Sequence, residues 1–347
     1  MAANTNTTYA AAVPATYRAY VHEHFGELAQ ELKLRTDVPQ ETLKNDQVRI
    51  HVHAAAINPI DYKLIEWGAR MLPFAPTPER PFRIGFDVAG VIAELGSDVT
   101  DLQVGDAVLA MGDFVTKGTF AEYVVIDAKY VAPKPAKLSF QHAAGLSLAG
   151  QTSYQALVAQ GQLQQGHRVL VLGGSSATGS LAIQIAKALG ASFVAATTST
   201  RNVEFVQAFG ADRVIDYTTE KWVDVLDANS IDLIFDCGVE SASWNDDAQR
   251  VLKHDTGRFV TIGQEITPIE SPVGATYIRF RTQPSGADLL VLTGLVERDE
   301  LRVPIDSVFG FEDLLGAFKS VKTGRSRGKV ILEVVAAAQP RALSLEP

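Results

Sequence analysis

Cysteine is almost absent from this chain: Cys237 is the single one among 347 residues. One thiol cannot form an intrachain disulfide, and it cannot supply a zinc site that is built from several thiolates. A composition without disulfides is typical of proteins in a reducing compartment, so we expect a cytoplasmic protein.

Long apolar runs and a basic excess are missing as well. No stretch approaches the roughly 20 apolar residues that a membrane-spanning helix needs, and residues 1–13 lack the basic and apolar regions of a secretory signal. The 40 acidic and 31 basic side chains give a net charge of −9. Such a charge repels nucleic acid and anionic membranes, so we expect neither as a partner.

The remaining composition, 46% hydrophobic and 20% charged residues, is that of a globular protein, and the length suits two domains. Short apolar or alternating runs predict a β-rich first half without alternating helices. These runs cover residues 17–25, 47–56, 90–95, 105–111 and 120–126. From about residue 165 onward, apolar strands alternate with helical periodicity, which predicts an α/β fold with a doubly wound parallel sheet. We assign residues 149–284 to this second domain, and residues 1–148 and 285–347 to the first.

A glycine-rich turn follows the apolar strand at residues 168–172 and precedes a helical pattern. Compared with the dinucleotide-binding fingerprint G-x-G-x-x-G, it has a serine at the second glycine position. The fingerprint positions are Gly174, Ser175, Ser176, Ala177, Thr178 and Gly179. Backbone N–H groups at such a turn, together with the positive end of the helix dipole, suit a pyrophosphate. The strand–helix context favours a dinucleotide, with a mononucleotide phosphate site and an ordinary tight turn as alternatives.

The stretch after the second strand of this domain predicts which dinucleotide is bound. A protein selective for NADH usually carries an Asp or Glu there, which binds the ribose hydroxyls. Residues 195–202 contain no carboxylate, and Thr198, Ser199 and Arg201 offer hydroxyls and a guanidinium instead. These groups suit the 2′-phosphate of NADPH, and Tyr217 could add a further donor. A polar loop with a solvated arginine is the alternative.

Several motifs occur in an order and spacing that resemble a known family. They lie at residues 57–63 (INPIDYK), 85–91 (GFDVAGV), 118–123 (GTFAEY), 149–154 (AGQTSY) and 327–330 (RGKV). Over residues 16–335 the chain resembles the zinc-free quinone oxidoreductase branch of the medium-chain dehydrogenase/reductase superfamily, which includes ζ-crystallin-like and enone reductases. The resemblance implies a GroES-like β-barrel catalytic domain with an inserted Rossmann domain, and an active site in the cleft between them. It also implies a homodimer formed through edge strands of the Rossmann sheets.

The resemblance implies roles for single residues. Asn58 and Phe86 stand where zinc-dependent relatives have a cysteine and a histidine ligand, so we expect no metal. Without a Lewis acid, hydride addition to an acceptor that is already electron-poor, such as a quinone or an enone, is the accessible reaction. Asn58 would lie beside the nicotinamide, and Lys63, a tyrosine in many relatives, could donate to the substrate oxygen or a ribose hydroxyl. Thr152 would hold the carboxamide or a nearby phosphate.

The ends of two later strands are expected to line the ribose and the nicotinamide. They carry Cys237, Gly238, Ile262 and Gly263. For Cys237, a small buried side chain without redox function is the favoured interpretation. The sequence thus predicts an NADPH-dependent quinone reductase. The alternatives are an enone or trans-enoyl double-bond reductase, and a structural protein that binds NADPH without turnover.

Overall fold

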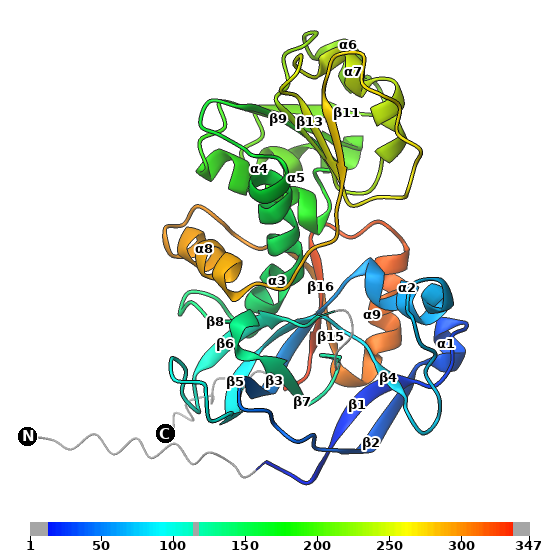
Figure 1. The fold of residues 1–347 in the computed structure, drawn as a ribbon, viewed down its shortest axis with the longest axis vertical. Coiled ribbons are helices and arrows are strands. Elements are labelled where there is room, and N and C mark those ends of the chain that lie inside the picture. Colours follow the sequence, from blue (N-terminus) through cyan, green and yellow to red (C-terminus); the bar gives the residue numbers. More distant parts are fainter. Residues whose placement is uncertain (1–12, 114–117, 336–347) are drawn as a thin grey trace, which may run out of the picture.

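The computed structural model describes residues 13–113 and 118–335. Two lobes share these residues, and helix α3, Phe140–Gln155, runs between them (Figure 1). The lower lobe contains a three-stranded and a seven-stranded sheet, and the upper lobe contains a six-stranded sheet. The mixed α/β architecture that the sequence predicts is therefore confirmed.

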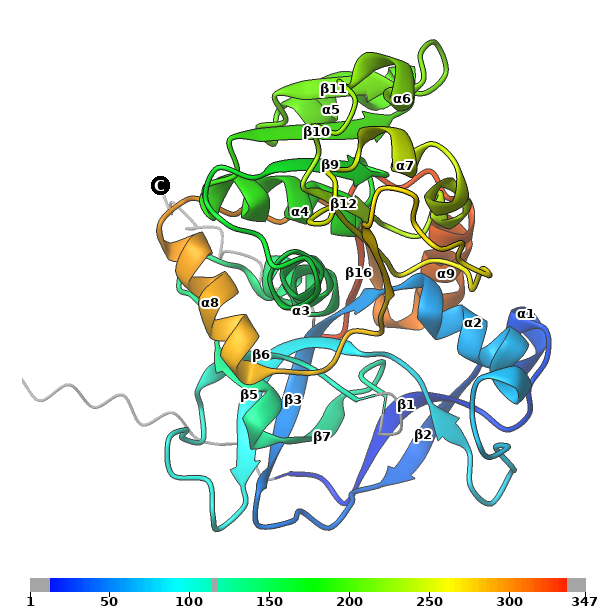
Figure 2. The same cartoon turned by 45° about the horizontal axis from the view of Figure 1, so that its top comes forward.

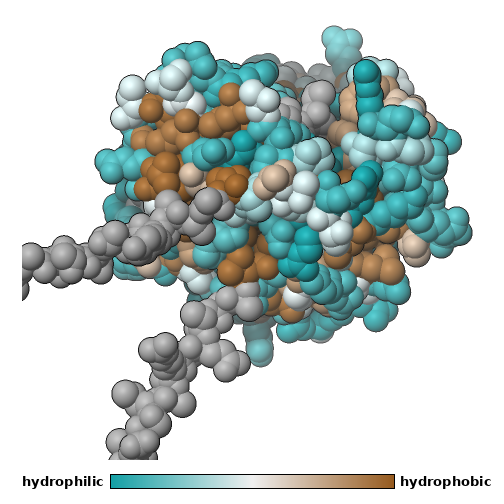
Figure 3. All heavy atoms as spheres, turned by 90° about the horizontal axis from the view of Figure 1, so that it is seen from below, coloured by the Kyte–Doolittle hydropathy of each residue, from teal (hydrophilic) through white to brown (hydrophobic). Residues whose placement is uncertain are grey.

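The lower lobe is the β-barrel domain. Its small sheet consists of β1 (Thr16–His22), β2 (Lys33–Pro39) and β4 (Phe82–Arg83). Its large sheet consists of β3 (Gln47–Ile57), β5 (Asp87–Leu95), β6 (Ala107–Met111), β7 (Tyr123–Asp127), β8 (Val131–Pro133), β15 (Ile305–Gly310) and β16 (Lys329–Glu333). Strand β3 is long and mostly buried because it pairs with three others, β5, β7 and β16. Seen from below, hydrophobic areas lie among hydrophilic side chains on this lobe (Figure 3).

The upper lobe is a Rossmann domain. Its strands are β9 (Arg168–Leu172), β10 (Phe193–Thr198), β11 (Arg213–Asp216), β12 (Leu233–Asp236), β13 (Arg258–Thr261) and β14 (Thr276–Arg279). They are parallel throughout, in the order β11-β10-β9-β12-β13-β14. This is the 3-2-1-4-5-6 order of the doubly wound dinucleotide-binding fold. The interior strands are mostly apolar and almost entirely buried, because helices cover both faces of such a sheet.

The helices connect and cover these sheets. The α-helices besides α3 are α1 (Leu28–Glu31), α2 (Pro59–Trp67), α4 (Ala177–Ala188), α5 (Val203–Gln207), α6 (Trp222–Val225), α7 (Ala248–Val251), α8 (Gly286–Glu297) and α9 (Leu314–Lys322). Short 3-10 turns cover Gly68–Arg70, Ala128–Tyr130, Thr200–Asn202, Ser241–Asn245 and Phe311–Asp313, and a π-helical turn, Ala156–Gln160, follows α3. In the part of the chain that the structure describes, none of the helices is long and apolar enough to cross a membrane.

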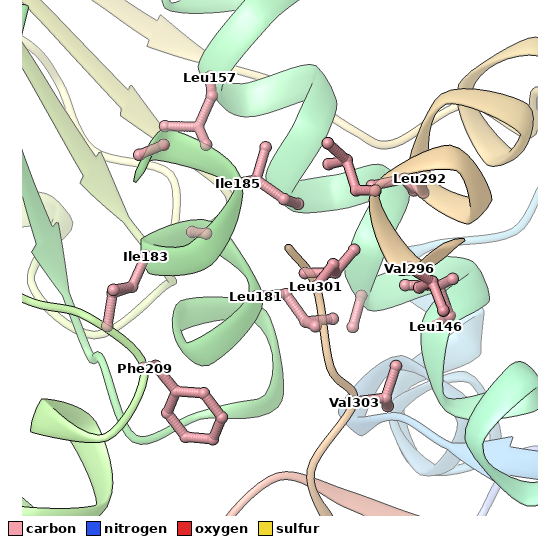
Figure 4. Close-up of a cluster of buried hydrophobic side chains, with 14 of the residues drawn as sticks. Leu146, Leu157, Leu181, Ile183, Ile185, Phe209, Leu292, Val296, Leu301 and Val303 are labelled. Carbon is pink, nitrogen blue, oxygen red and sulfur yellow. The ribbon is translucent and has the colours of Figure 1, made fainter. Parts of the chain in front are cut away.

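The two lobes are joined by a common apolar core. Helix α3 lies between α4 and α8 (Figure 2). Leu146 of α3, Ile185 of α4 and Leu292 of α8 belong to one buried cluster (Figure 4). The chain returns to the lower lobe after α8, where β16 pairs antiparallel with β3. Because α3 crosses the boundary that we expect between residues 148 and 149, the domain limits stay predictions.

The first half contains a helix that the sequence interpretation lacks. An extended segment after Asn58 would turn Tyr62 and Lys63 to opposite sides, but residues 59–67 form α2. The helix begins because Asn58 and Asp61 form a capping box and Pro59 occupies the first turn. The expectation of a first half without helices was therefore wrong, although the local signals for a helix were present.

Candidate cofactor cleft and active site

The expected cofactor residues lie at the carboxyl ends of the Rossmann strands. Strand β9 is flanked by β10 on one side and β12 on the other. Since β10 and β12 are reached by connections to opposite sides, a crevice opens at this point, and ligands of such sheets bind there. The loops after β9, β10, β12 and β13 form its rim.

The glycine-rich turn after β9 leads directly into α4. Ser176 is the N-cap of this helix, with φ of −69°, and its hydroxyl accepts the N–H of Gly179 at 2.9 Å. A negative φ does not require glycine, which explains why serine can replace the second glycine of the fingerprint. At Gly179 a side chain is excluded, because its Cβ would lie 2.3 Å from the carbonyl oxygen of Gly173. Ala177 and Thr178 form the first turn of α4, where free N–H groups can meet a phosphate.

The loops after β10 and β11 meet beside this turn. The side chain of Asn202 donates to the hydroxyls of Ser175, at 3.2 Å, and Ser199, at 3.3 Å. Thr198 is buried, and its hydroxyl has no hydrogen-bond partner among the described residues. Tyr217 donates its backbone N–H to the carbonyl of Thr198 and leaves its ring exposed. The structure thus brings together the residues that we expect at the adenosine end.

An arginine from the other lobe completes this group and was missed in the sequence. Arg327, in the loop before β16, donates from Nε to the side-chain oxygen of Asn202 at 2.8 Å and from its terminal nitrogen to the carbonyl of Arg201 at 2.8 Å. Arg201 in turn donates to the carbonyl of Arg325 at 3.5 Å. The guanidinium groups of Arg201 and Arg327 therefore both lie at the loop that follows Thr198. A carboxylate, that of Asp216, lies at the end of the neighbouring strand β11. It accepts a hydrogen bond from the Thr218 hydroxyl at 2.7 Å.

The polar groups near Thr198 are suited to a phosphate. An unpartnered buried hydroxyl can donate to a phosphate oxygen, and guanidinium groups form strong charge-assisted hydrogen bonds with phosphate. The hydroxyl of Ser326, between Arg325 and Arg327, also lacks a partner among the described residues. The residues present therefore fit a nucleotide phosphate at this end of the crevice.

Asn58 belongs to a buried polar network. Its side-chain nitrogen donates to Asp87 at 2.8 Å, and its side-chain oxygen accepts from the Lys329 ammonium at 2.7 Å. Lys329 also donates to Asp87 at 2.8 Å, and Asp87 accepts the backbone N–H of Leu148. The amide of Asn58 is thus engaged on both sides. A hydrogen bond from it to a substrate carbonyl would have to compete with these contacts.

Asp61 lies next to this network and is fully buried. One carboxyl oxygen accepts the backbone N–H of Asn58 at 2.6 Å, and the other lacks a partner within the described residues. Burial and the neighbouring charge of Asp87 raise the pKa of Asp61 well above its ordinary value. The buried position therefore shifts this carboxyl group toward its protonated form, compared with an exposed aspartate.

Lys63 and Thr152 have partners within the protein. The Lys63 ammonium lies 6.0 Å from the centre of the Trp67 ring, one turn further along α2. The Thr152 hydroxyl bonds the carbonyl of Leu148 at 2.8 Å and the hydroxyl of Thr282 at 2.7 Å. Thr282 lies where the chain leaves the Rossmann domain, so this contact joins the two connections between the lobes. Neither position tests the role that the resemblance implies.

The loops after β12 and β13 face the glycine-rich turn. Cys237 lies near Gly173, because a Cβ placed on Gly173 would be 3.5 Å from the Cβ of Cys237. Burial and the charge of Asp236 raise the pKa of the Cys237 thiol. Ile262 and Gly263 follow β13, and a Cβ on Gly263 would come within 3.0 Å of the Cα of Gly238. The structure thus places these two predicted segments against each other.

No group of three or more His, Cys, Asp or Glu side chains that could hold a metal occurs within residues 13–113 and 118–335. Phe86, at the position of a zinc-ligating histidine in relatives, is a buried apolar side chain of the barrel core.

Comparisons with known proteins agree with this architecture. Residues 44–136 match the alcohol dehydrogenase GroES-like domain family, and residues 209–332 match the family described as zinc-binding dehydrogenase. The chain is 36% identical over 345 residues to 2-methylene-furan-3-one reductase of Solanum lycopersicum, covering 96% of this chain and 83% of that protein. It is 35% identical over 336 residues to the chloroplastic NADPH-dependent alkenal/one oxidoreductase of Arabidopsis thaliana, covering 94% and 82%.

A solved structure shows the same fold across most of the chain. The quinone oxidoreductase from Coxiella burnetii has 32% sequence identity and a TM-score of 0.78, and the match covers 92% of this chain and 100% of that one. Relatives that are similar over more than four fifths of their length establish the family, and the names of two of them state a nicotinamide cofactor. The chain therefore belongs to the quinone oxidoreductase branch of the medium-chain dehydrogenase/reductase superfamily and is a nicotinamide-dependent oxidoreductase.

Proposed function

We propose that this protein transfers hydride from NADPH to quinones or related conjugated carbonyl compounds without zinc. The observation that carries the NADPH preference is the arginine group, Arg201 and Arg327, at the loop after Thr198, whose buried hydroxyl is unpartnered among the described residues. In a protein with a net charge of −9, two guanidinium groups at this loop favour a phosphate dianion over two ribose hydroxyls.

The acceptor class follows from what activates the acceptor. The Lys329 ammonium lies 2.7 Å from the side-chain oxygen of Asn58. Its positive charge disfavours a divalent cation at the position of a zinc ligand, and Phe86 beside it cannot ligate one. Reduction without a Lewis acid requires an acceptor that delocalises the incoming charge onto its own oxygen. Quinones and conjugated enones both meet this requirement.

In this proposal NADPH supplies the hydride when it is bound. The protein's own residues bind and orient: the α4 N-terminus and the arginine group hold the two phosphate regions, and the loops after β12 and β13 line the nicotinamide end. The Asn58–Asp87–Lys329 network gives the floor of the cleft a fixed polar shape. We expect water to protonate the product, because Asp61 is fully buried and Lys329 already donates to two acceptors.

A double-bond reductase for enones is the second candidate. The tomato and Arabidopsis relatives favour it, because their names describe reduction of a methylene-furanone and of alkenals or alkenones. The Coxiella relative favours the quinone. A structural protein that binds NADPH without turnover is the remaining possibility.

Purified protein tests these candidates. We expect NADPH oxidation, followed by absorbance, with 9,10-phenanthrenequinone, and slower oxidation with 2-enals and 2-enoyl thioesters. Faster turnover of 2-enals than of the quinone would favour the second candidate, and NADPH binding without any turnover would favour the structural role. Turnover that prefers NADH, or stoichiometric zinc in the active enzyme, would contradict the proposal.

The oligomeric state is part of the proposal. Strand β14 forms one end of the Rossmann sheet and pairs with β13 alone. An edge strand of this kind can pair with that of a second copy. We expect a homodimer in solution, which light scattering would detect as twice the chain mass.

A further inference from the structure

Asp236 ends strand β12 at the rim of the crevice, and its buried carboxylate accepts five hydrogen bonds. The donors are the backbone N–H groups of Gly238, Val239 and Glu240 at 3.0, 2.8 and 3.0 Å, and the hydroxyls of Ser241 and Thr261 at 2.8 and 2.7 Å. No ion pair to this carboxylate occurs among the described residues. Five donors compensate the burial of the charge without a cation.

This carboxylate connects two loops. One of its oxygens accepts the three consecutive N–H groups after β12, so the loop curves around it. The other oxygen accepts from Thr261, whose hydroxyl in turn accepts the N–H of Gly263 at 2.8 Å. The loop after β13 is thereby fixed to the same carboxylate as the loop after β12.

The loop after β12 approaches the glycine-rich turn, and the loop after β13 packs against it. Val239 is 60% exposed, and its methyl groups would lie 3.4 and 3.5 Å from a Cβ on Gly173 of the glycine-rich turn. Cys237 approaches the same glycine. The arginine group, by contrast, lies on the loops after β10 and before β16 and has no contact with Asp236. The carboxylate therefore lies on the side of the crevice where we expect the nicotinamide, away from the arginine group.

We propose that Asp236 is a positioning residue that sets the nicotinamide half of the cofactor site by holding both loops in register. This inference rests on the proposed use of a nicotinamide cofactor. Both oxygens of Asp236 already accept hydrogen bonds from the protein. It acts through the backbone of Gly238 and Gly263, which its hydrogen bonds keep in place.

The variant Asp236→Asn tests the proposal with little change in volume. The amide oxygen can still accept the three N–H groups, but the amide nitrogen cannot accept from Ser241 and Thr261. Asp232→Asn is the matched control. Asp232 lies at the other end of β12, directly before Leu233, and is also buried. It accepts the N–H of Arg168 at 2.8 Å and a hydrogen bond from the Lys253 ammonium at 2.7 Å.

Binding is measured by calorimetry with two probes, NADPH and adenosine 2′,5′-bisphosphate, which lacks the nicotinamide half. We expect Asp236→Asn to weaken NADPH binding about tenfold and the bisphosphate less than about twofold, and Asp232→Asn to change both by less than about twofold. Thr261→Val removes one link between the loops, and we expect it to weaken NADPH binding about threefold. This variant replaces Asp236→Asn in the test if Asp236→Asn does not fold.

The outcomes distinguish a positioning role of Asp236 from a role in fold stability alone. Equal effects of Asp236→Asn and Asp232→Asn on NADPH, or an equal loss of both probes in Asp236→Asn, would show that the carboxylate only stabilises the fold. Unchanged NADPH binding in Thr261→Val would also overturn the proposal. Failure of the wild-type protein to bind either NADPH or NADH would overturn the proposed function itself, and this inference with it.

Discussion

The buried pair of Lys329 and Asp87 gives the sharpest prediction for stability. The two side chains are 2% and 0% exposed and lie 2.8 Å apart. Replacing Lys329 by Met keeps most of the apolar stem but leaves the Asp87 carboxylate buried without a cation. Removal of one partner of a buried pair typically costs about 3–5 kcal/mol. The side-chain oxygen of Asn58 also loses its donor, so we expect Lys329→Met to lie within this range.

The control is a lysine–aspartate pair with a nearly equal distance but more water around it. Lys253 and Asp232 lie 2.7 Å apart, and the lysine is 40% exposed. Because the lysine end of this pair is solvent-exposed while Asp232 is 9% exposed, water can partly replace the ammonium, and we expect Lys253→Met to cost less than Lys329→Met. Unfolding by urea, followed by circular dichroism, gives the free energy of unfolding for each variant.

A double variant decides whether the uncompensated charge is the cause. Adding Asp87→Asn to Lys329→Met removes the buried negative charge, so we expect the double variant to be more stable than Lys329→Met alone. A loss below about 1 kcal/mol in Lys329→Met, or further destabilisation by Asp87→Asn, would refute the reasoning.

Three further predictions concern the cofactor, the pH and the thiol. Arg327→Ala should lower kcat/KM for NADPH about tenfold and leave kcat/KM for NADH nearly unchanged. The control Arg298→Ala, at an exposed position paired with Glu300, should change neither value. Equal losses with both cofactors in Arg327→Ala would contradict a 2′-phosphate contact. Burial lowers the pKa of His22, His51 and His53 in the folded protein. Below about pH 6.5 the unfolded chain therefore binds more protons than the folded one. The urea concentration at the unfolding midpoint should fall as the pH drops from about 7.5 to about 5.5. The raised pKa of Asp61 acts in the opposite direction, because its folded form binds a proton more readily than its unfolded form. Asp61→Asn should therefore steepen the fall. A wild-type midpoint that rises toward pH 5.5 would refute the assignment of lowered histidine pKa values. Because its pKa is raised, Cys237 should react more slowly with iodoacetamide at neutral pH than free cysteine does, and faster labelling would contradict its burial.

The sequence predicted the Rossmann sheet well because its signals are local. The interior strands are short apolar runs, and the run at residues 168–172 coincides with β9. The glycine-rich turn and the start of α4 also follow from neighbouring residues. Helix α2 was missed despite its capping box, since the short runs of the first half were interpreted as strands only.

The surroundings of Asn58 and Arg201 could not be predicted in the same way. Asn58 bonds to residues 29 and 271 positions away, and Arg201 meets Arg327 across 126 positions. No periodicity or spacing reports such contacts, because they arise only when β16 returns to pair with β3. The motif at residues 327–330 marked the family, but its arginine gave no local sign of a partner in the other lobe.

The same return of the chain makes the candidate site a property of both lobes. The turn that would hold the pyrophosphate lies in the Rossmann domain, yet Gly328 forms a bridge with Ser176, the N-cap of α4. Arg327 and Lys329, on either side of Gly328, extend in two directions: one to the loop after β10, the other to Asn58 and Asp87 under the active site. A shift of this single segment would therefore alter the adenosine end and the cleft floor together. The two ends of the proposed cofactor site are thus coupled through the backbone of residues 327–329 as well as through the Rossmann sheet.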